Sequence, residues 1–429
     1  MELLRAGWLL PITGPPLRDG RVAVEDGRVV WLGRAGDPGQ PHAPLRDLGE
    51  GVLLPGLVNA HCHLELSHLA GKLPRAEGRF VPWVESVVAS RGQHTNAEIA
   101  SAASAAITAL EASGTVALGD VSNTLAHLER LSASSLSAVV FLELLAWDPA
   151  MAETTLAWGE GLVRERGAAL RPGLELRLAA HAPHSVSPEL LRLLAARGGP
   201  AAIHLAESPD EAQFLAEGKG AWPGFLASRG LGQVSFAPAR QTPVRYADGL
   251  GVLHSRLVAA HGVQVDAVDR ALLRDRGVHV VLCPRSNAAL GVGRAAAPAL
   301  HAAGVKLALG SDSLASAPSL DVLDDAILLR EQFPELAPAA ILRMATLGGA
   351  EALGFPELGA IAPGRRAAFA YAPAPSAPLI AAPKPRARPP RGRGGSLPTA
   401  GRPRARAAGS SRARRRRPRA GRARSRPAP

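Results

Sequence analysis

The sequence is poor in cysteine, and it lacks long apolar runs. Its two cysteines, Cys62 and Cys283, lie far apart in 429 residues, so they offer no disulfide framework and favour a reducing compartment. No apolar stretch reaches the ~20 residues of a membrane-spanning helix. The short apolar run before Pro11 lacks the basic start and cleavage site of a signal peptide. We therefore expect a cytoplasmic protein without membrane association.

Acidic residues are absent from 384–429, which hold sixteen arginines and one lysine. The first 383 residues therefore carry 32 basic and 37 acidic side chains, a net charge of −5, against +12 for the whole chain. The excess of basic charge thus lies in residues 384–429, and the larger part of the chain has no charge pattern typical of nucleic-acid binding. Its Arg- and Pro-rich composition predicts that the tail, 383–429, is disordered, because it cannot bury enough apolar surface to fold.

Three explanations of this tail stay open. It could be the product of a shifted reading frame in a GC-rich gene, a solvated extension without function, or a basic arm that binds nucleic acid non-specifically through phosphates. No aromatic residue follows Tyr371, so base stacking is not indicated. We favour the first two explanations, and we keep a nucleic-acid-binding protein with the remainder as a scaffold as the competing class of function.

Two kinds of pattern divide the rest of the chain. Short strand patterns punctuated by glycine, such as 21–24 and 28–32 around Asp26-Gly27, predict the N-terminal part of a small β domain over 1–52. Over 53–355, short apolar runs alternate with Ala- and Leu-rich amphipathic segments, which indicates βα units and a parallel sheet. After a final helix, the turn at Pro363-Gly364 predicts a truncated return to the β domain over 356–382.

The number of apolar runs predicts the fold class. Eight strands are expected at 52–58, 115–119, 138–144, 174–180, 200–205, 256–260, 278–283 and 305–310. Eight is the number that a closed (β/α)8 barrel requires. The prediction is therefore an α/β protein, a TIM barrel with a small β-sandwich formed from both ends of the folded chain.

Polar residues follow several of these strands, where a barrel carries its catalytic groups. His61 and His63 share one face of an extended segment, since side chains at i and i+2 point the same way. His204 lies in the fifth strand, and Asp312 ends a strongly apolar strand, where a carboxylate needs a cation or a hydrogen-bond partner. Together these residues predict a site for one divalent metal ion, zinc or ferrous iron.

Glu207 and His261 are the candidates for proton handling near such a metal. A metal lowers the pKa of bound water, and a carboxylate such as Glu207 can then carry the proton. Each residue also has a structural interpretation: Glu207 as an acidic group at a helix N-terminus, Asp312 as a helix cap, and His261 as a core histidine. The residues alone leave these alternatives open.

The ordered motifs resemble the amidohydrolase superfamily, in its mononuclear deaminase and chlorohydrolase branch. The resemblance runs from the β domain to about Arg366, and its motifs cover residues 55–63, 181–188, 204–207, 261–262, 283–287 and 310–312. It implies that His61, His63, His204 and Asp312 bind the metal. Glu207, His261 and Asp312 would be the catalytic residues. The four lysines, none at the end of a middle strand, argue against a second metal bridged by a modified lysine.

The resemblance also implies a reaction and a pocket. Water would attack a ring carbon that bears an amino group, and ammonia would leave. Substrate contacts are expected from Glu65, Trp83, His181, His184, Arg285, Asn287 and Ser313. Within the branch, segments 63–67 and 78–83 are most similar to the aminodeoxyfutalosine deaminases of menaquinone biosynthesis, which act on 6-amino-6-deoxyfutalosine. Adenosylhomocysteine and methylthioadenosine deaminases, or another amidohydrolase or chlorohydrolase, are the alternatives.

We expect the binding partner to be a small-molecule substrate. Whether the chain forms a homodimer stays open. The other zinc deaminase fold is excluded because the sequence has no C-x-x-C pair.

Overall fold

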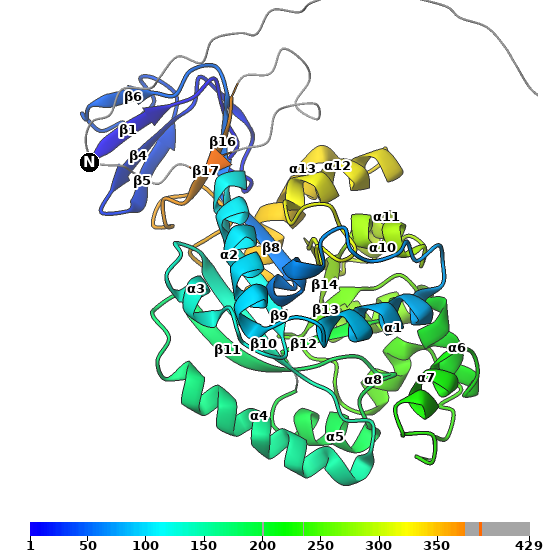
Figure 1. Ribbon diagram of the computed structural model, residues 1–429. Helices are drawn as coiled ribbons and strands as arrows, with labels where there is room; N and C mark the ends of the chain where they lie inside the picture. The colour runs from blue at the N-terminus through cyan, green and yellow to red at the C-terminus, as the bar shows by residue number, and fades with distance from the viewer. Residues whose placement is uncertain (200, 235, 374–385, 388–429) are drawn as a thin grey trace, which may run out of the picture. The chain divides into compact units, whose positions relative to one another are not determined.

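The computed structural model describes residues 1–199, 201–234, 236–373 and 386–387 (Figure 1). Residues 388–429, to which most of the predicted tail belongs, lie outside the described residues, as do 374–385. The three explanations of the tail therefore stay predictions.

Eight parallel strands form the centre of the described chain, one close to each predicted run. They are β8 (Leu57–Cys62), β9 (Thr115–Ser122), β10 (Ser137–Leu144), β11 (Leu174–Ala180), β12 (Ala202–Leu205), β13 (Val258–His261), β14 (His279–Leu282) and β15 (Lys306–Leu309). Small and branched side chains fill the space between them: Val58, Ala117, Val139 and Val281 are buried around the ring of Phe141. This apolar packing fixes the strand ends that carry the site.

The strands form two four-stranded sheets, in the orders β11-β10-β9-β8 and β12-β13-β14-β15. The single closed sheet that the sequence predicts is therefore not observed. Backbone hydrogen bonds nevertheless connect the sheets at both edges: Ala201 donates to Leu178 and His204 to His181, both at 2.8 Å, and Ser311 donates to His61 at 3.0 Å. Strands β12 and β15, which form these edges, are four residues long.

Helices follow most of the strands, as alternating βα units require. They are α1 (Phe80–Arg91), α2 (Asn96–Ser113), α3 (Leu128–Ser132), α4 (Ala152–Gly167), α5 (Pro188–Ala196), α6 (Pro209–Glu217), α7 (Trp222–Ser228), α8 (Pro243–Gly249), α9 (Ala267–Asp275), α10 (Pro284–Leu290), α11 (Ala297–Ala302), α12 (Val322–Gln332), α13 (Pro338–Arg343) and α14 (Gly349–Leu353). Short 3-10 turns η1 (Leu64–Leu69) and η2 (Pro149–Met151) and the π turn η3 (Met344–Gly348) complete the set.

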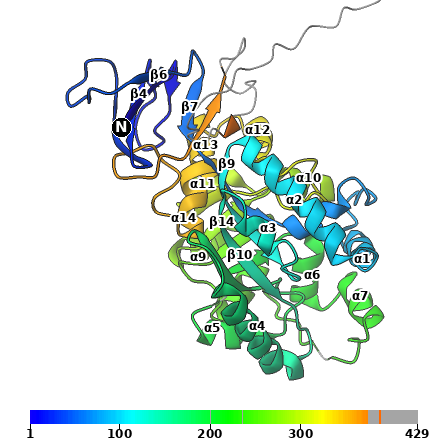
Figure 2. The same cartoon turned by 60° about the vertical axis from the view of Figure 1, so that its left-hand side comes forward.

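Local sequence explains where these helices begin and end. The side chains of Thr95 and Glu98 form a capping box at the start of α2, and Gly114 ends that helix with φ of 95°. Asp266 and Asp269 form the same box before α9. Helix α4 packs against α5 and β11 (Figure 2). Among the described residues, no helix combines the length and the apolar character that crossing a membrane demands.

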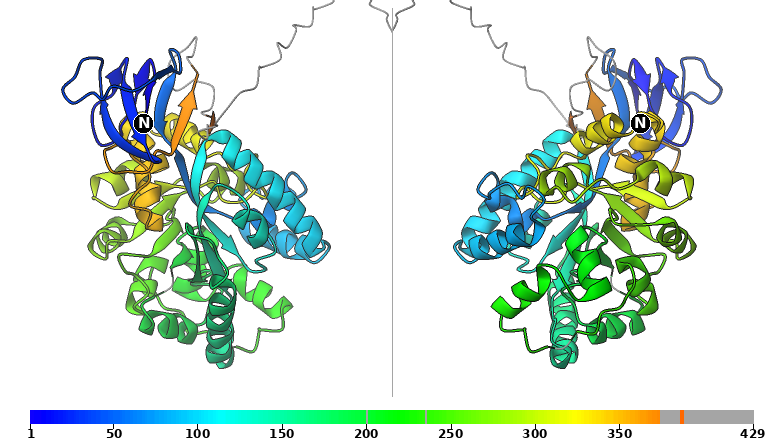
Figure 3. Two further views of the ribbon diagram at one scale, coloured as in Figure 1. Left: turned by 90° about the vertical axis from the view of Figure 1, so that its left-hand side faces the viewer. Right: turned by 90° about the vertical axis from the view of Figure 1, so that its right-hand side faces the viewer.

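Both ends of the described chain contribute to the small β part. One sheet has the order β5-β4-β1-β6 and contains β1 (Glu2–Arg5), β4 (Arg21–Glu25), β5 (Arg28–Gly33) and β6 (Leu45–Asp47). The other has the order β17-β16-β7-β2-β3 and contains β2 (Trp8–Leu9), β3 (Leu17–Arg18), β7 (Val52–Pro55), β16 (Phe369–Ala372) and β17 (Arg386–Ala387). Figure 3 shows β16 beside the N-terminal strands, where it pairs antiparallel with β7.

The first predicted run, 52–58, is divided between the two parts of the structure. Its first half is β7 of the small sheet, and its second half opens β8. The division falls at Gly56, where a Cβ atom would lie 2.2 Å from the side chain of Val116. Only glycine therefore lets the chain pass from one sheet to the other so close to β9. The strand β16 also appears where the sequence shows no clear strand.

Three non-glycine residues at strand ends have positive φ. They are Ala206 at 54°, His261 at 76° and Asp312 at 57°. L-residues adopt this left-handed region at a cost of roughly 1–2 kcal/mol each. All three follow or end a parallel strand, so the backbone turns sharply where the candidate site lies.

Candidate active site

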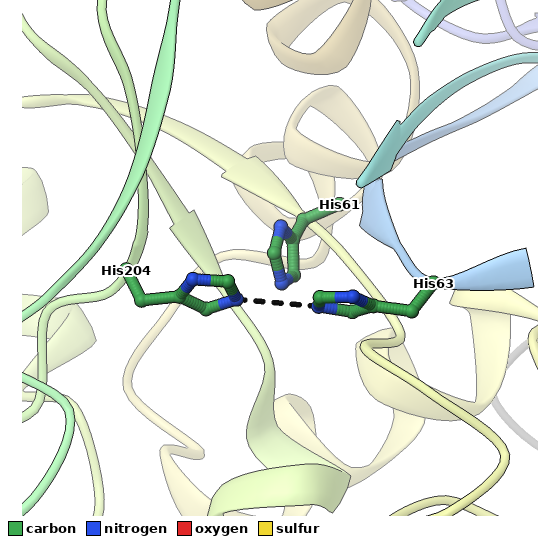
Figure 4. A group of neighbouring side chains, drawn as sticks. All are labelled: His61, His63 and His204. Atoms are coloured by element: carbon green, nitrogen blue, oxygen red, sulfur yellow. Dashed lines mark hydrogen bonds between the residues drawn. The ribbon is translucent and has the colours of Figure 1, made fainter. Parts of the chain in front are cut away.

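Three histidines and one aspartate meet at the carboxyl ends of the parallel strands. His61 is near the end of β8, His63 precedes η1, His204 lies in β12 and Asp312 follows β15. Figure 4 shows the imidazoles of His61, His63 and His204 turned toward one another. The structure thus brings together all four residues that the sequence predicts as metal ligands.

The donor atoms of this group lie within a few ångströms of one another. The Nε2 atoms of His63 and His204 are 3.2 Å apart. Oδ1 of Asp312 lies 3.5 Å from Nε2 of His63 and 4.0 Å from Nε2 of His61. Within the described part of the chain, the buried Nε2 of His61 has no hydrogen-bond partner. A buried imidazole nitrogen without a partner is costly unless a cation or ligand meets it.

Burial keeps the imidazoles of His61 and His204 neutral. It lowers the pKa of His204 to about 3, with a further contribution from His181, and it lowers the pKa of His61 well below its usual value. Neutral imidazoles are the form that binds metal, so the cluster is ready for a cation at neutral pH. The Nδ1–H of His204 donates to the backbone oxygen of His181 at 2.9 Å, which leaves Nε2 free to face the cluster.

Asp312 is held as an anion by the groups around it. Burial alone would raise its pKa, but His63, His261 and a hydrogen bond from Ser286 bring the pKa of Asp312 below its ordinary value. The hydroxyls of Ser286 and Ser316 both donate to Oδ2, the second at 3.0 Å. Oδ1 therefore faces the histidines while Oδ2 is fixed by serines.

Glu207 and His261 lie beside this group, as predicted. Nε2 of His261 is 3.6 Å from Oε1 of Glu207, and its Nδ1 is 3.0 Å from Oδ1 of Asn287. Burial, and then the nearby charge of Asp312, raises the pKa of Glu207 well above its usual value. Glu207, His261 and Asp312 offer ligand atoms within 4.8 Å of one another. Two carboxyls with oppositely shifted pKa values therefore face one centre.

The donor set fits a divalent cation of borderline softness. Three imidazole nitrogens and one carboxylate oxygen converge, and the second polar atom of His204 and of Asp312 has a hydrogen-bond partner of its own. The unpartnered Nε2 of His61 also fits a bound cation, because only a ligand in the centre would satisfy this nitrogen.

One face of α1 forms a wall of the pocket that opens over this centre. Its pocket-lining residues are Phe80, Trp83, Val84, Val87, Val88 and Arg91. Their spacing of three and four residues places them on a single helix face. The wall is therefore apolar along most of its length and ends in a guanidinium.

Aromatic residues of α7 form another side of the pocket. The ring of His184 stacks on Trp222 with centroids 4.1 Å apart, and Trp222 packs edge-on against Phe225 at 5.3 Å. His181, also in the pocket, has Nδ1 at 2.5 Å from Oγ of Ser185, and burial lowers the pKa of His181 to about 3. A flat apolar ring is the kind of group that such walls accept.

The other predicted substrate residues have mixed positions. Trp83, His181, His184 and Ser313 line the pocket. Glu65 also lines it, but its carboxylate already accepts bonds from Arg91, Ser122, Asn123 and Thr124. Its pKa is lowered because Arg91 and these donors outweigh burial. The observed role of Glu65 is to hold the ends of α1 and β9 together.

Two predicted contacts lie outside the pocket wall. The guanidinium of Arg285 turns toward α12 and bonds to Asp325 at 2.8 and 2.9 Å and to Asp324 at 3.0 Å. Asn287 contacts the ring of His261 instead. The expectation that Arg285 lines the pocket is therefore wrong for this structure, since two carboxylates of α12 satisfy its charge.

The structure adds pocket residues that the sequence reasoning did not single out. Arg91, Asn123 and Glu143 line one end, and Phe80, Trp222 and Phe225 line another. Glu143 carries a signal that could have found it: it is a carboxyl group near the end of a strongly apolar strand, like Asp312. Arg91 and Asn123 carry no such signal, because ordinary surface helices and loops contain the same residues.

This arrangement defines a class of protein. A buried group of imidazoles and a carboxylate that can hold a divalent cation, flanked by a protonatable glutamate and a histidine, is the equipment of a metal-dependent hydrolase. A model of the amidohydrolase family matches residues 52–380, and the chain belongs to this family.

Known proteins similar to this chain agree with the class. An aminodeoxyfutalosine deaminase of Deinococcus radiodurans is 35% identical over 354 residues, 77% of this chain and 82% of the relative. A 5-methylthioadenosine/S-adenosylhomocysteine deaminase of Moorella thermoacetica is 30% identical, over 85% of this chain and 84% of the relative. The crystal structure of an adenosine deaminase from Xanthomonas campestris with bound zinc matches with a TM-score of 0.71 and 28% identity, over 86% of this chain and 84% of the other.

Proposed function

We propose that the protein hydrolyses the C–N bond of an aminated purine nucleoside, with 6-amino-6-deoxyfutalosine as the best candidate substrate. One observation carries the proposal: the buried cluster of His61, His63, His204 and Asp312 opens into a pocket with aromatic and apolar walls. A flat heteroaromatic ring fits such walls, and the acidic and basic groups lie at one end of them. The similar deaminases support this choice.

The reaction adds water across a carbon–nitrogen bond. The oxygen of water bonds to the ring carbon that bears the amino group, the bond from that carbon to nitrogen breaks, and ammonia leaves. When bound, the divalent metal supplies a Lewis acid that makes water a stronger acid near neutral pH. We propose zinc for this role, with ferrous iron as the alternative, because imidazole ligands suit both metals.

Two carboxyls divide the proton transfers between them. Asp312, whose pKa is low, accepts a proton from the attacking water and then passes it to the amino group, which leaves as ammonia. Glu207, whose pKa is high, carries a proton that it can donate to a ring nitrogen of the substrate. Groups whose pKa values are pushed apart commonly take the base and acid roles in this way.

His261 orients the attacked carbon, and its own ring is fixed. Asn287 contacts Nδ1 at 3.0 Å, which turns Nε2 toward Glu207 and the reaction centre. Burial of His261, with 1% of its surface exposed, keeps bulk water away from this contact. The positive φ of His261 directs the side chain to this position.

The alternative reactions share the same centre. An adenosylhomocysteine or methylthioadenosine deaminase would use the same cluster and differ only in what the far pocket binds. Loss of chloride from a heteroaromatic ring would need the same water but no proton for ammonia. The similar deaminases favour deamination over loss of chloride.

The test is ammonia release by protein loaded with zinc. We expect release from aminodeoxyfutalosine, at a kcat/KM above those for methylthioadenosine, adenosylhomocysteine and adenosine. In Glu207→Gln, kcat should fall about 10²- to 10⁴-fold with the metal content unchanged. No ammonia from any of the four compounds would refute the proposal, and chloride release from a chlorinated triazine would then indicate the alternative.

We also propose the architecture that joins this site to the chain. Residues 53–355 form the metal-dependent (β/α)8 barrel, 1–52 and 356–382 form a small β-sandwich, and 383–429 form a separate tail. The edge hydrogen bonds between β11 and β12 support closure of the barrel. A homodimer, and non-specific binding of nucleic acid by the tail, stay predictions.

A further inference from the structure

Glu143 is a buried carboxyl group in the pocket that the chemistry described above does not use. It is the penultimate residue of β10, its side chain is 5% exposed, and it lines the pocket beside His181 and His204. Its Oε1 has no hydrogen-bond partner within the described part of the chain. A buried carboxyl oxygen without a donor is unfavourable unless a ligand supplies one.

The neighbours of Glu143 determine which oxygen is open. Nδ2 of Asn123 donates to Oε2 at 3.0 Å and to the backbone oxygen of the same residue at 3.1 Å. Oδ1 of Asn123 in turn accepts a bond from Nη1 of Arg91 at 2.9 Å, which fixes the amide with Nδ2 toward Glu143. Oε2 is therefore occupied, and Oε1 is the free acceptor.

The adjacent histidine does not supply the missing donor. Nδ1 of His204 lies 3.5 Å from Oε1, but its N–H donates to the backbone oxygen of His181 at 2.9 Å. The other nitrogen of His204 faces His63 and the metal-ligand cluster. Oε1 of Glu143 thus lies near Nδ1 of His204, while Nε2 of the same ring faces the metal-ligand cluster.

This position suits the second part of a nucleoside. With the base at the cluster, the sugar follows at about the width of a ring, and its hydroxyl groups are donors that Oε1 lacks. Among the described pocket-lining residues, the other buried side-chain atoms without a partner are the ring nitrogens of His184 and Nε1 of Trp222, so Oε1 of Glu143 is the one carboxyl oxygen among them. Oε1 lacks a hydrogen-bond donor, and a sugar hydroxyl group would supply one.

We propose that Glu143 is a specificity-determining residue that accepts a hydrogen bond from a sugar hydroxyl of the substrate. This inference rests on the proposed deamination of a nucleoside, and it adds that the enzyme selects ribonucleosides over deoxynucleosides. Asn123 and Arg91 act as positioning residues, because they hold the carboxyl group so that Oε1 faces the pocket.

The Glu143→Gln variant tests this assignment. Its amide oxygen stays with Nδ2 of Asn123, so the amide NH2 replaces the open acceptor with a donor at nearly the same volume. The matched control is Glu153→Gln, which changes an exposed glutamate on α4. The substrates are adenosine, 2′-deoxyadenosine and 3′-deoxyadenosine, and the metal content of each variant is measured in parallel.

We expect the kcat/KM of the wild type for adenosine to exceed that for at least one deoxy compound. Glu143→Gln should lower the adenosine value about ten- to a hundredfold, the effect of one hydrogen bond to a charged group. It should change the value for that deoxy compound by less than about threefold and leave the metal content at the wild-type level. Glu153→Gln should leave the kcat/KM values for adenosine and for the deoxy compound unchanged.

An equal loss for adenosine and both deoxy compounds would overturn the assignment, and so would loss of metal from Glu143→Gln. Binding of the products, inosine and its 2′- and 3′-deoxy forms, requires no turnover and separates the two proposals. If Glu143→Gln weakens only the binding of inosine while the wild type releases no ammonia, the proposed reaction fails and sugar recognition stands. If ammonia is released but the variant binds all three products like the wild type, only the Glu143 assignment fails.

Discussion

At the scale of single residues, the unpartnered Nε2 of His61 is the atom on which the metal site depends. Replacing His61 with alanine removes one of three imidazoles from a buried cluster, and the remaining ligands cannot complete a four-coordinate site. We expect bound zinc to fall from about one ion per chain to below about 0.1, and kcat to fall on the order of a thousandfold. Elemental analysis of the purified protein and an ammonia assay measure both.

The matched control is His42→Ala, which removes an exposed histidine of the small β part. Its zinc content and kcat should equal those of the wild type. Full zinc occupancy in His61→Ala would contradict the ligand assignment.

Residue chemistry correctly predicts that the four proposed metal ligands lie together, but it does not predict where Arg285 points. His61 and His63 share a face because of their spacing, and Asp312 ends an apolar strand, so both signals are local. Arg285 has an equally local motif, but the partners that turn it away, Asp324 and Asp325, lie about forty residues later on α12. No local pattern contains that information.

At the scale of single elements, α1 is the part of the pocket that a substitution tests most directly. Trp83 lies on its pocket face, so Trp83→Ala removes a large apolar side chain from the pocket wall and changes none of the proposed metal ligands. We expect KM to rise about tenfold, which corresponds to losing roughly 1.5 kcal/mol of binding. Steady-state kinetics with metal analysis would measure this.

The exposed Glu85 of the same helix provides the comparison. Glu85→Ala should leave KM unchanged, since its side chain points away from the pocket. If Trp83→Ala lowered kcat and left KM at the wild-type value, α1 would be acting on the reaction centre rather than on binding.

The first turn of α6 holds the loop that carries Glu207. The carboxyl group of Glu211 accepts bonds from the backbone nitrogens of Ala206 at 3.2 Å and Glu207 at 2.8 Å. Burial, with a contribution from Glu207, raises the pKa of Glu211 from 4.5 to about 8. The folded state therefore holds this proton more tightly than the unfolded state.

A raised pKa makes the folded state lose stability as the pH rises. The contribution of Glu211 is complete below pH 4.5 and falls by about 1.4 kcal/mol per pH unit up to its folded pKa of about 8. Glu211→Gln should therefore unfold at higher urea concentration than the wild type at pH 9, and lose this advantage at pH 5. Parallel pH curves for the two proteins would contradict the expectation, and Glu217→Gln on the same helix is the exposed control.

The sequence predicts the positions of the strands more accurately than it predicts which strands pair. Each of the eight apolar runs has a strand near it, because burial on both faces leaves a continuous apolar signature. The run 52–58 was divided at Gly56 because its first half pairs with β2 and β16. Pairing with residues more than three hundred positions away leaves no trace in the run itself.

At the scale of the whole molecule, β16 connects the end of the described chain to its beginning. It pairs with β7, and the hydroxyl of Tyr371 donates to the backbone oxygen of Leu48. A chain ending at Ala387 should keep its zinc and its activity within about twofold, because the site residues lie between 61 and 313. A chain ending at Arg366 should lose about 3 kcal/mol or more of unfolding free energy, since it lacks the buried residues of β16.

Urea unfolding and zinc analysis of the two truncated chains would compare these effects. Equal stability would mean that β16 contributes nothing to the fold. Loss of activity in the longer chain would show that residues 388–429 matter to the site. The same longer chain tests the tail as a nucleic-acid-binding arm, since any binding that persists must come from elsewhere.

The global prediction from sequence was right about the parallel strands and incomplete about how they close. The alternation of apolar runs and amphipathic segments identifies βα units, but it cannot show whether edge strands of four residues form a continuous ladder. Closure depends on the twist and tilt of all eight strands together.

The left-handed backbone at Ala206 offers a route to a more heat-tolerant enzyme. His261 and Asp312 have the same strained conformation, but their side chains belong to the proposed site. Ala206 contributes a buried methyl group, and glycine adopts a φ of 54° without the steric penalty of roughly 1–2 kcal/mol, which is larger than the roughly 0.5–1 kcal/mol that glycine costs in chain entropy. An engineer can therefore relieve strain one residue before Glu207 and keep every functional group, which makes Ala206→Gly the first substitution to try in a thermostabilised variant.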